Sequence, residues 1–167
     1  NVPFDDIADA ADVCRTTVFN HFADAGELKQ AIAVAEIGEL IEFGEQSELR
    51  GLVLIRTVLE KLIDDTANYP RVMARLTNAT ILGGESGRVG EIERMIARQY
   101  EIEFGAFPAS APVSANLFAQ MTMGLYYGQV NHLLAHGLPF DVKKMQSDMR
   151  AMLDYMLTGI RANQVVK

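Results

Sequence analysis

The apolar residues of this 167-residue chain recur three and four positions apart over most of its length. Leu52, Ile55 and Leu59 show this spacing, as do Ile92 and Ile96. Residues so spaced lie on one face of an α-helix, whereas a half-buried strand requires strict alternation of apolar and polar residues. We find no sustained alternation, so the sequence predicts an all-α fold.

Breaks in this periodicity divide the chain into eight predicted helices. Pro70 marks one start, because proline suits the first helical position and disfavours a helical conformation in the residue before it. The glycine-rich segment 83–90 predicts a connector, since it lacks the Gly-Lys-Ser/Thr ending of a phosphate-binding loop. The predicted helices are Phe4–Ala11, a short helix around Val18–Phe22, Glu27–Gly44, Leu49–Ala67, Pro70–Leu82, one bearing the stripe Ile92 to Phe107 and ended by Pro108, Ser114–His136, and Val142–Ala162.

The formal net charge of −7 is unusual for a nucleic-acid-binding protein, which normally carries a basic surface. Residues 1–44 hold nine acidic side chains and two basic ones, whereas residues 45–167 hold thirteen of each sign. The whole imbalance therefore lies in the first quarter of the chain. Within that quarter, the stretch Arg15–His21 contains no acidic residue.

Several protein classes are disfavoured by simple features. The single cysteine, Cys14, forms neither an internal disulfide nor a metal-binding cluster, which favours a reduced, cytoplasmic setting. No basic segment followed by an apolar one opens the chain, so we expect no secretion signal. Residues 104–140 lack Asp, Glu, Lys and Arg, but Pro108, Pro112 and several amides interrupt them. We therefore expect a helix buried in protein rather than a membrane span.

The most specific pattern in the chain spans residues 7–22. Ala8 and Ala11 are small enough for a second helix to cross the first closely, and Val18 and Phe22 anchor that second helix on its inner side. This arrangement predicts a helix-turn-helix, whose second helix can enter a major groove about 12 Å wide. The outward-facing residues of that helix are then Arg15, Thr16, Phe19 and Asn20.

This segment resembles the helix-turn-helix of the TetR family of bacterial transcription regulators. The family pattern is an Ile-Ala pair, Ala-Gly-Val-Ser in the turn, Thr-Leu-Tyr-x-His-Phe, and Lys-x-x-Leu at the start of the next helix. The resemblance covers about Phe4 to Ile32, and beyond it only the helical architecture agrees. It implies a first helix before Asn1, a homodimer on a roughly palindromic operator, and a small-molecule pocket in the C-terminal domain. The matching residues are Ile7-Ala8, Ala11-Asp12-Val13-Cys14 and Thr17-Val18-Phe19-Asn20-His21-Phe22.

The resemblance also implies DNA contacts for particular residues. Arg15 and Thr16 fall where the family touches bases or nearby phosphates, and the motif threonine and histidine are placed to contact the backbone. Asn20 occupies the variable position between the motif aromatic residue and the histidine, where it can contact a base edge. The predicted DNA-binding residues are Arg15, Thr16, Thr17, Phe19, Asn20 and His21.

Four positions depart from the family pattern. Asp12 replaces the turn glycine, Cys14 replaces the usual serine cap, Phe19 lacks the tyrosine hydroxyl, and Ala25 replaces a phosphate-binding lysine. Each lost phosphate contact lowers DNA affinity and its salt dependence. These departures motivate the alternative interpretation, a helical sensor or scaffold dimer that no longer binds DNA.

The C-terminal half contains three weaker patterns. His132 and His136 are spaced to chelate a metal, but no acidic residue lies nearby in sequence, so we expect no metal site. Gly124 and Gly128 allow close helix contact, either with a dimer partner or within the subunit. The methionine-rich last helix suits either a ligand surface or, preferably, a four-helix dimer interface. The resemblance likewise implies a homodimer through the last two helices.

A ligand pocket is expected where inward stripes of successive helices combine apolar and a few polar groups. The effector would then be apolar or aromatic. The candidate lining residues are Leu59, Ile63, Leu76, Tyr100, Phe104, Tyr127 and Asn131.

The sequence and the resemblance together predict a ligand-responsive DNA-binding regulator, most simply a repressor released from its operator by a small molecule. Residues 1–44 would form the DNA-binding domain, and residues 45–167 a helical ligand-binding and dimerisation domain. We find no set of residues suited to catalysis and expect no enzyme activity and no cofactor. The acid pairs Asp5-Asp6 and Asp64-Asp65 are expected to be solvated helix faces.

Overall fold

A computed structural model describes residues 4–68, 70, 89–105 and 113–165 of the chain. Every regular element among these residues is an α-helix, which confirms the all-α prediction. In chain order the helices are α1 (Phe4–Ala10), α2 (Arg15–His21), α3 (Ala25–Gln46), α4 (Gly51–Asn68), α6 (Val89–Phe104), α7 (Ala115–Ala135) and α8 (Val142–Val165).

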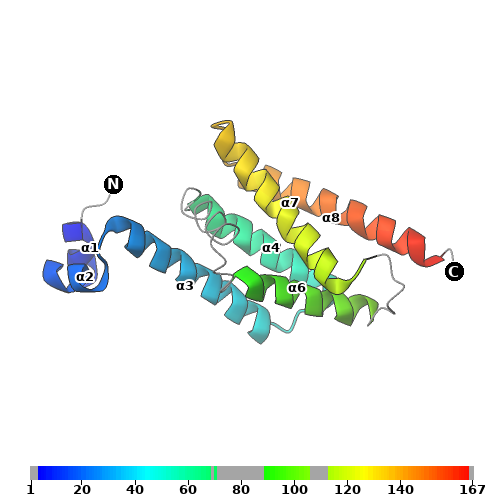
Figure 1. The fold of residues 1–167 in the computed structure, drawn as a ribbon, viewed down its shortest axis with the longest axis horizontal. Helices are drawn as coiled ribbons and strands as arrows, with labels where there is room; N and C mark the ends of the chain where they lie inside the picture. The colour runs from blue at the N-terminus through cyan, green and yellow to red at the C-terminus, as the bar shows by residue number, and fades with distance from the viewer. Residues whose placement is uncertain (1–3, 69, 71–88, 106–112, 166–167) are drawn as a thin grey trace.

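The helices form a small head and a larger body (Figure 1). The head consists of α1 and α2, which pack against each other at one end of the molecule. The long helix α3 leads from the head into the body, where α4, α6, α7 and α8 pack together. The boundary predicted at residue 44 falls inside α3, so one continuous helix belongs to both parts.

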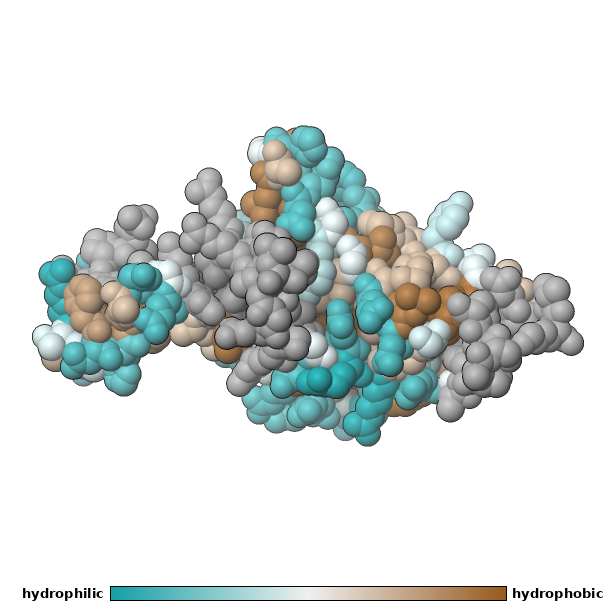
Figure 2. Space-filling model, in the orientation of Figure 1, coloured by the Kyte–Doolittle hydropathy of each residue, from teal (hydrophilic) through white to brown (hydrophobic). Residues whose placement is uncertain are grey.

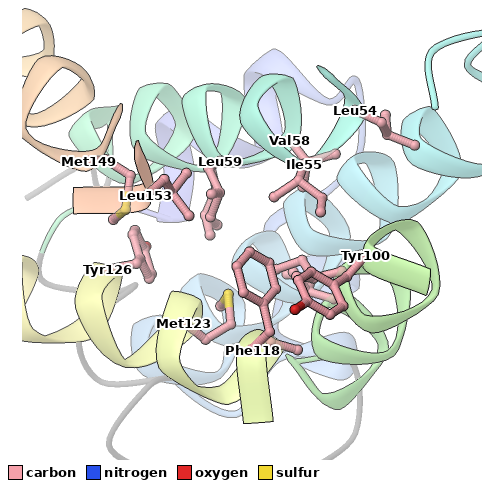
Figure 3. Packing of buried hydrophobic residues seen from close by; sticks show 14 of the residues in the cluster. Leu54, Ile55, Val58, Leu59, Tyr100, Phe118, Met123, Tyr126, Met149 and Leu153 are labelled. Carbon is pink, nitrogen blue, oxygen red and sulfur yellow. The ribbon is translucent and has the colours of Figure 1, made fainter. Parts of the chain in front are cut away.

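The body is built around one apolar core, drawn from the C-terminal half of α3 and from α4, α6, α7 and α8 (Figure 3). On α4 the predicted inward residues Leu52, Ile55, Leu59, Leu62 and Ile63 are all buried. Across the core, Tyr100 of α6 stacks on Phe118 of α7, with ring centroids 4.3 Å apart. The stripe of apolar residues visible in the sequence of α4 is therefore part of the core.

Two predicted helix ends differ from the structure. The helix expected to continue to Phe107 ends at Phe104, because Gly105 adopts φ +78° and its N–H bonds to the carbonyl of Glu101 at 2.8 Å. Glycine adopts this left-handed conformation without the steric cost that other residues incur. Except for Pro70, the predicted helix Pro70–Leu82 lies outside the described residues, as does most of the glycine-rich segment 83–90.

The inner face predicted for α3 is wrong at two positions of its N-terminal half. The helical spacing of Leu28, Ile32, Ala35 and Leu40 predicts that all four face inward. Leu28 is half-buried and Leu40 is buried, whereas Ile32 and Ala35 are exposed, and the first buried residue among those of α3 with a described exposure is Ile37. This half of α3 spans the distance between head and body, whereas Leu40 and its neighbours join the body core. Periodicity shows which residues share a face but not where along a helix a partner begins.

None of the helices within the described ranges has the length and apolar character needed to cross a membrane. The charge-free stretch that raised this question forms α7, whose inner face lies in the core. Ser114 caps its first turn by accepting the N–H of Leu117 at 3.2 Å. At its other end Gly137 adopts φ +62°, one residue after the predicted helix end at His136.

Candidate functional site

The turn between α1 and α2 is closed by backbone hydrogen bonds around Asp12. Asp12 has φ +53°, and its N–H bonds to the carbonyl of Asp9 while that of Val13 bonds to the carbonyl of Ala8. This pair of bonds is a Schellman motif, which satisfies carbonyls at a helix C-terminus. Aspartate tolerates positive φ better than most residues do. The replacement of the family's turn glycine is therefore compatible with the turn.

The helix α2 begins without a side-chain cap. Cys14 occupies the N-cap position in an extended conformation, and its side chain makes no hydrogen bond to the first-turn amides. Its Sγ instead lies 3.0 Å from Oγ1 of Thr17, and this hydrogen bond lowers the pKa of the exposed Cys14 thiol. As the sequence indicated, α2 lacks the serine cap that the family pattern would supply.

Replacing Cys14 with serine should stabilise the head. A serine Oγ in this backbone conformation can accept the N–H of Thr17 at the third helical position, and such caps contribute about 0.5–2 kcal/mol. We expect slower amide exchange in α2, measured by hydrogen–deuterium exchange. The Cys14→Ala variant serves as control, because alanine supplies no acceptor. Equal protection in the two variants would show that the cap does not form.

The outer face of α2 is exposed and free of acidic side chains. Arg15, Thr16, Phe19 and Asn20 are all exposed, whereas Val18 on the opposite face is 6% exposed. The guanidinium of Arg15 lies over the Phe19 ring, 5.3 Å from its centroid. In Figure 2 the head presents a small apolar area surrounded by hydrophilic residues. The structure thus brings together the four residues that the sequence placed on one outward face.

The other two predicted DNA-contacting residues lie beside this face. Thr17 is half-buried and engaged with Cys14, whereas His21 is exposed in the last turn of α2. His21 is the only basic residue of that turn. The head therefore offers two basic side chains on α2, Arg15 at its start and His21 at its end.

Acidic side chains follow α2 in the sequence, at the start of α3. Asp24 caps α3 by accepting the N–H groups of Gly26 and Glu27 at 2.6 and 2.9 Å, and Glu27 in turn accepts the N–H of Ala23 at 2.6 Å. A helix N-terminus can bind phosphate through its free amides. Here the exposed carboxylate of Asp24 occupies those amides, so this end of α3 is not available for a phosphate.

Most of the predicted ligand residues lie in or beside the body core. Leu59, Ile63 and Tyr100 are buried, and Phe104, Tyr127 and Asn131 are half-buried. Leu76 lies outside the described residues. None of the six described residues lines the cavities that lie between α3 and α6, between α6 and α7, and at the turn from α7 into α8. Their surroundings are those of packed core side chains.

Three cavities are lined entirely by described residues. A groove of about 720 Å³ lies between α3 and α6. A cavity of about 250 Å³ lies between α6 and the start of α7, and one of about 270 Å³ lies where α7 turns into α8. None of them was predicted from the sequence, because each brings together residues from separate elements, and the approach of those elements is a property of the tertiary fold.

Several buried polar groups on α7 lack a hydrogen-bond partner among the described residues. These are the Thr122 hydroxyl, the Tyr127 hydroxyl and the side-chain oxygen of Gln129. Nearby, the Tyr126 hydroxyl lies 2.5 Å from Oγ1 of Thr66, which itself donates to the carbonyl of Leu62. Buried polar groups are normally satisfied, so unsatisfied ones indicate a place for water or a ligand.

The tyrosines of this region remain protonated at neutral pH. Burial raises the pKa of Tyr126 to about 12, although the hydrogen bond with Thr66 opposes the increase. Burial also raises the pKa of Tyr127 well above its usual value, and the adjacent Tyr126 adds to the effect. Both hydroxyls are therefore neutral hydrogen-bond donors. Sequence reasoning identified Tyr127 but missed Thr122 and Gln129, although polar residues on an otherwise apolar helix face were the available signal.

The histidine pair and the glycine pair of α7 both lie on the surface of the subunit. His132 and His136 are exposed with ring centroids 4.6 Å apart, and no group of three potential metal-ligating side chains occurs among the described residues. Gly124 and Gly128 are also exposed, and a Cβ atom built on either would meet nothing within 4 Å. The glycines therefore do not serve close packing within the described part of the subunit.

Comparison of this chain with models of protein families, with curated proteins and with solved structures finds no match.

Proposed function

We propose that the protein is a ligand-responsive DNA-binding regulator, most simply a repressor. The observation that carries the proposal is the outer face of α2. Seven consecutive residues, Arg15–His21, contain no acidic side chain although the surrounding sequence is strongly acidic. This face is presented to solvent at one end of the molecule, on a helix anchored through Val18.

In the proposed mechanism α2 enters the major groove of DNA. Residues near the N-terminus of such a helix lie closest to the base edges, which places Arg15 and Thr16 at the bases or adjacent phosphates. Arginine pairs with guanine and asparagine with adenine through two hydrogen bonds each. Arg15 and Asn20 are thus the side chains on this face best suited to recognise sequence.

A homodimer through the last two helices would present two such heads. The outer side of α7 carries exposed apolar and small residues, Leu117, Met121, Gly124 and Gly128, with no charge among them. On α8, Tyr155 is 87% exposed. Apolar surface of this kind on helices favours association with a second copy. Heads held about 34–36 Å apart would contact half-sites one helical turn apart.

The substitution Gly124→Glu tests this interface. We expect the subunit to fold normally, because the new side chain meets nothing within 4 Å and because glycine lowers helix stability by about 1 kcal/mol relative to alanine. In the dimer, however, the new carboxylates would be buried in an apolar contact. Analytical ultracentrifugation should show that the variant self-associates at least tenfold more weakly than the wild type. The control Gln120→Glu lies on the side of α7 toward α6, and dissociation of both variants to the same extent would argue against this face.

The effector site in this proposal lies in the body among α4, α6 and α7. The unsatisfied groups of Thr122, Tyr127 and Gln129 would hydrogen-bond an otherwise apolar or aromatic molecule. A ligand can shift the position of the heads only if it binds one arrangement of the body more tightly than the other. The helix α3 provides the physical connection, since its C-terminal half is part of the body core and its N-terminal end adjoins the head.

The proposal is tested by mobility shift with the full protein and the DNA upstream of its own gene. We expect a specific shift at low salt that weakens as salt increases, because each neutralised phosphate releases counterions. Absence of any shift at low salt would instead favour a helical sensor or scaffold dimer without DNA-binding activity. The carboxylates of Asp6, Asp9 and Asp24, all exposed on the head, are the observation that favours this alternative.

A further inference from the structure

The groove between α3 and α6 is lined by apolar side chains and by several arginines. Arg50, Arg94 and Arg98 line it, and we call it the arginine groove. Its apolar side chains include Met95 and Ile102. The volume of about 720 Å³ is in the range of small-molecule sites in proteins, roughly 300–1,000 Å³.

The apolar part of the groove depends on a close approach of two helices. At Gly44 of α3 an added Cβ atom would lie 2.1 Å from the sulfur of Met95 on α6, so a larger residue here would require the flexible Met95 side chain to move. Ile41 precedes Gly44 by almost one turn on α3, and Ile102 lies two turns after Met95 on α6. Ile102 remains half-exposed at 50%. The result is an apolar strip that remains open to solvent.

The arginines are available for an anion. Within the described part of the chain, neither Arg94 nor Arg98 forms a hydrogen bond or an ion pair, and both are exposed. Arg50 is held at the groove by donating to the carbonyls of Ser47 and Leu49. Two carboxylates, Glu45 and Glu91, also line the groove, so its net charge is positive although the whole chain carries −7.

We propose that the arginine groove binds a soluble amphiphilic anion, consisting of an alkyl chain with a carboxylate or phosphate head group. The alkyl chain of this ligand would lie along Ile41, Met95 and Ile102. Its head group would accept hydrogen bonds from the guanidinium groups of Arg94 and Arg98. Guanidinium groups match carboxylate and phosphate oxygens in geometry as well as in charge. In Figure 2 hydrophilic residues gather along the lower side of the body, near α6 as drawn in Figure 1. This site is separate from the effector site proposed in the core and does not depend on DNA binding.

Isothermal titration calorimetry with decyl phosphate below its micellar concentration tests the proposal on the full chain. We expect saturable binding that weakens at least tenfold in Arg94→Gln/Arg98→Gln, because each charge-assisted hydrogen bond contributes a factor of about ten or more. The control Lys143→Gln/Arg161→Gln removes the same charge from exposed positions on α8 and should bind as wild type does. If both double variants bind decyl phosphate equally more weakly than the wild type, the proposed site is wrong.

Two further probes distinguish the contribution of the charged head group to binding from that of the alkyl chain. Decyltrimethylammonium has the same chain and the opposite charge, and inorganic phosphate has a similar head without a chain. We expect both to bind at least tenfold more weakly than decyl phosphate. The variant Ile102→Ser should also weaken decyl phosphate binding while leaving the fold intact, because Ile102 is half-exposed. Equal affinity for the cationic probe, or unchanged binding in Ile102→Ser, would contradict the proposed groove. Because no DNA is present, failure here leaves the regulator proposal standing.

Discussion

Replacing both Arg15 and Asn20 with alanine should abolish specific operator binding while leaving the protein folded. Both side chains are exposed on the outer face of α2, so their removal costs little in packing. A two-hydrogen-bond contact to a base discriminates by about 1–3 kcal/mol, and a dimer loses each contact twice. We therefore expect a decrease in affinity of at least 100-fold, measured by fluorescence anisotropy with the operator found by mobility shift.

The single variants distinguish the roles of these two side chains. If Arg15 contacts a phosphate, Arg15→Ala should weaken binding to all DNA sequences. It should also reduce the salt slope, meaning the slope of log affinity against log salt concentration, by about one per head. Asn20→Ala should leave the salt slope unchanged and relax preference at one base position. The control Lys143→Ala removes an exposed charge at the start of α8, far from the head in Figure 1. Wild-type affinity in the double variant would rule out α2 as the DNA-contacting helix.

Phe118→Ala should produce the largest loss of stability among single changes in the body. Phe118 is fully buried, and its ring stacks on Tyr100 with an interplanar angle of 22° (Figure 3). Truncating a buried phenylalanine removes its transfer free energy and leaves a cavity, at a total cost of about 3–5 kcal/mol. Urea denaturation at one fixed protein concentration measures this free energy of unfolding, since a dimer's stability depends on concentration.

The matched control for this change is Val53→Ala on α4. Val53 is 58% exposed, and alanine has the higher helix propensity, so we expect the free energy of unfolding to change by less than about 0.5 kcal/mol. A loss below about 1 kcal/mol in Phe118→Ala would mean that α6 and α7 do not pack through these rings. The pair of variants thus tests the arrangement of the core directly.

Helix positions were largely predictable from the sequence, for identifiable reasons. Ser114 and Gly137 bracket α7, and the apolar stripes of α4 and α8 are continuous enough to identify both helices and their inner faces. A turn between the first two helices was expected from their spacing, and Asp12 adopts the positive φ of this turn, which aspartate tolerates better than most residues do. The helix α6 ends at Phe104, before the predicted stop at Pro108, because Gly105 adopts a left-handed conformation that ends the helix.

The candidate site was predictable only in part. The exposed face of α2 follows from the spacing of Val18 and its neighbours, because residues on the side opposite a buried anchor must face solvent. The exposure of Ile32 did not follow, since it depends on where α3 meets the body. Thr122 and Gln129 were missed because their hydrogen-bonding needs become visible only when the surrounding side chains are placed.

The sequence by itself determined that the chain is helical, where most of its helices lie, and which residues of the short helix α2 face outward. These properties depend on residues close together in the chain, so spacing and caps are sufficient to specify them. Only the tertiary structure decided that Gly124 and Gly128 face outward, that α3 joins head and body, and that Arg94 and Arg98 share a groove with Arg50. Those properties arise from contacts between helices distant in sequence, which local periodicity does not specify.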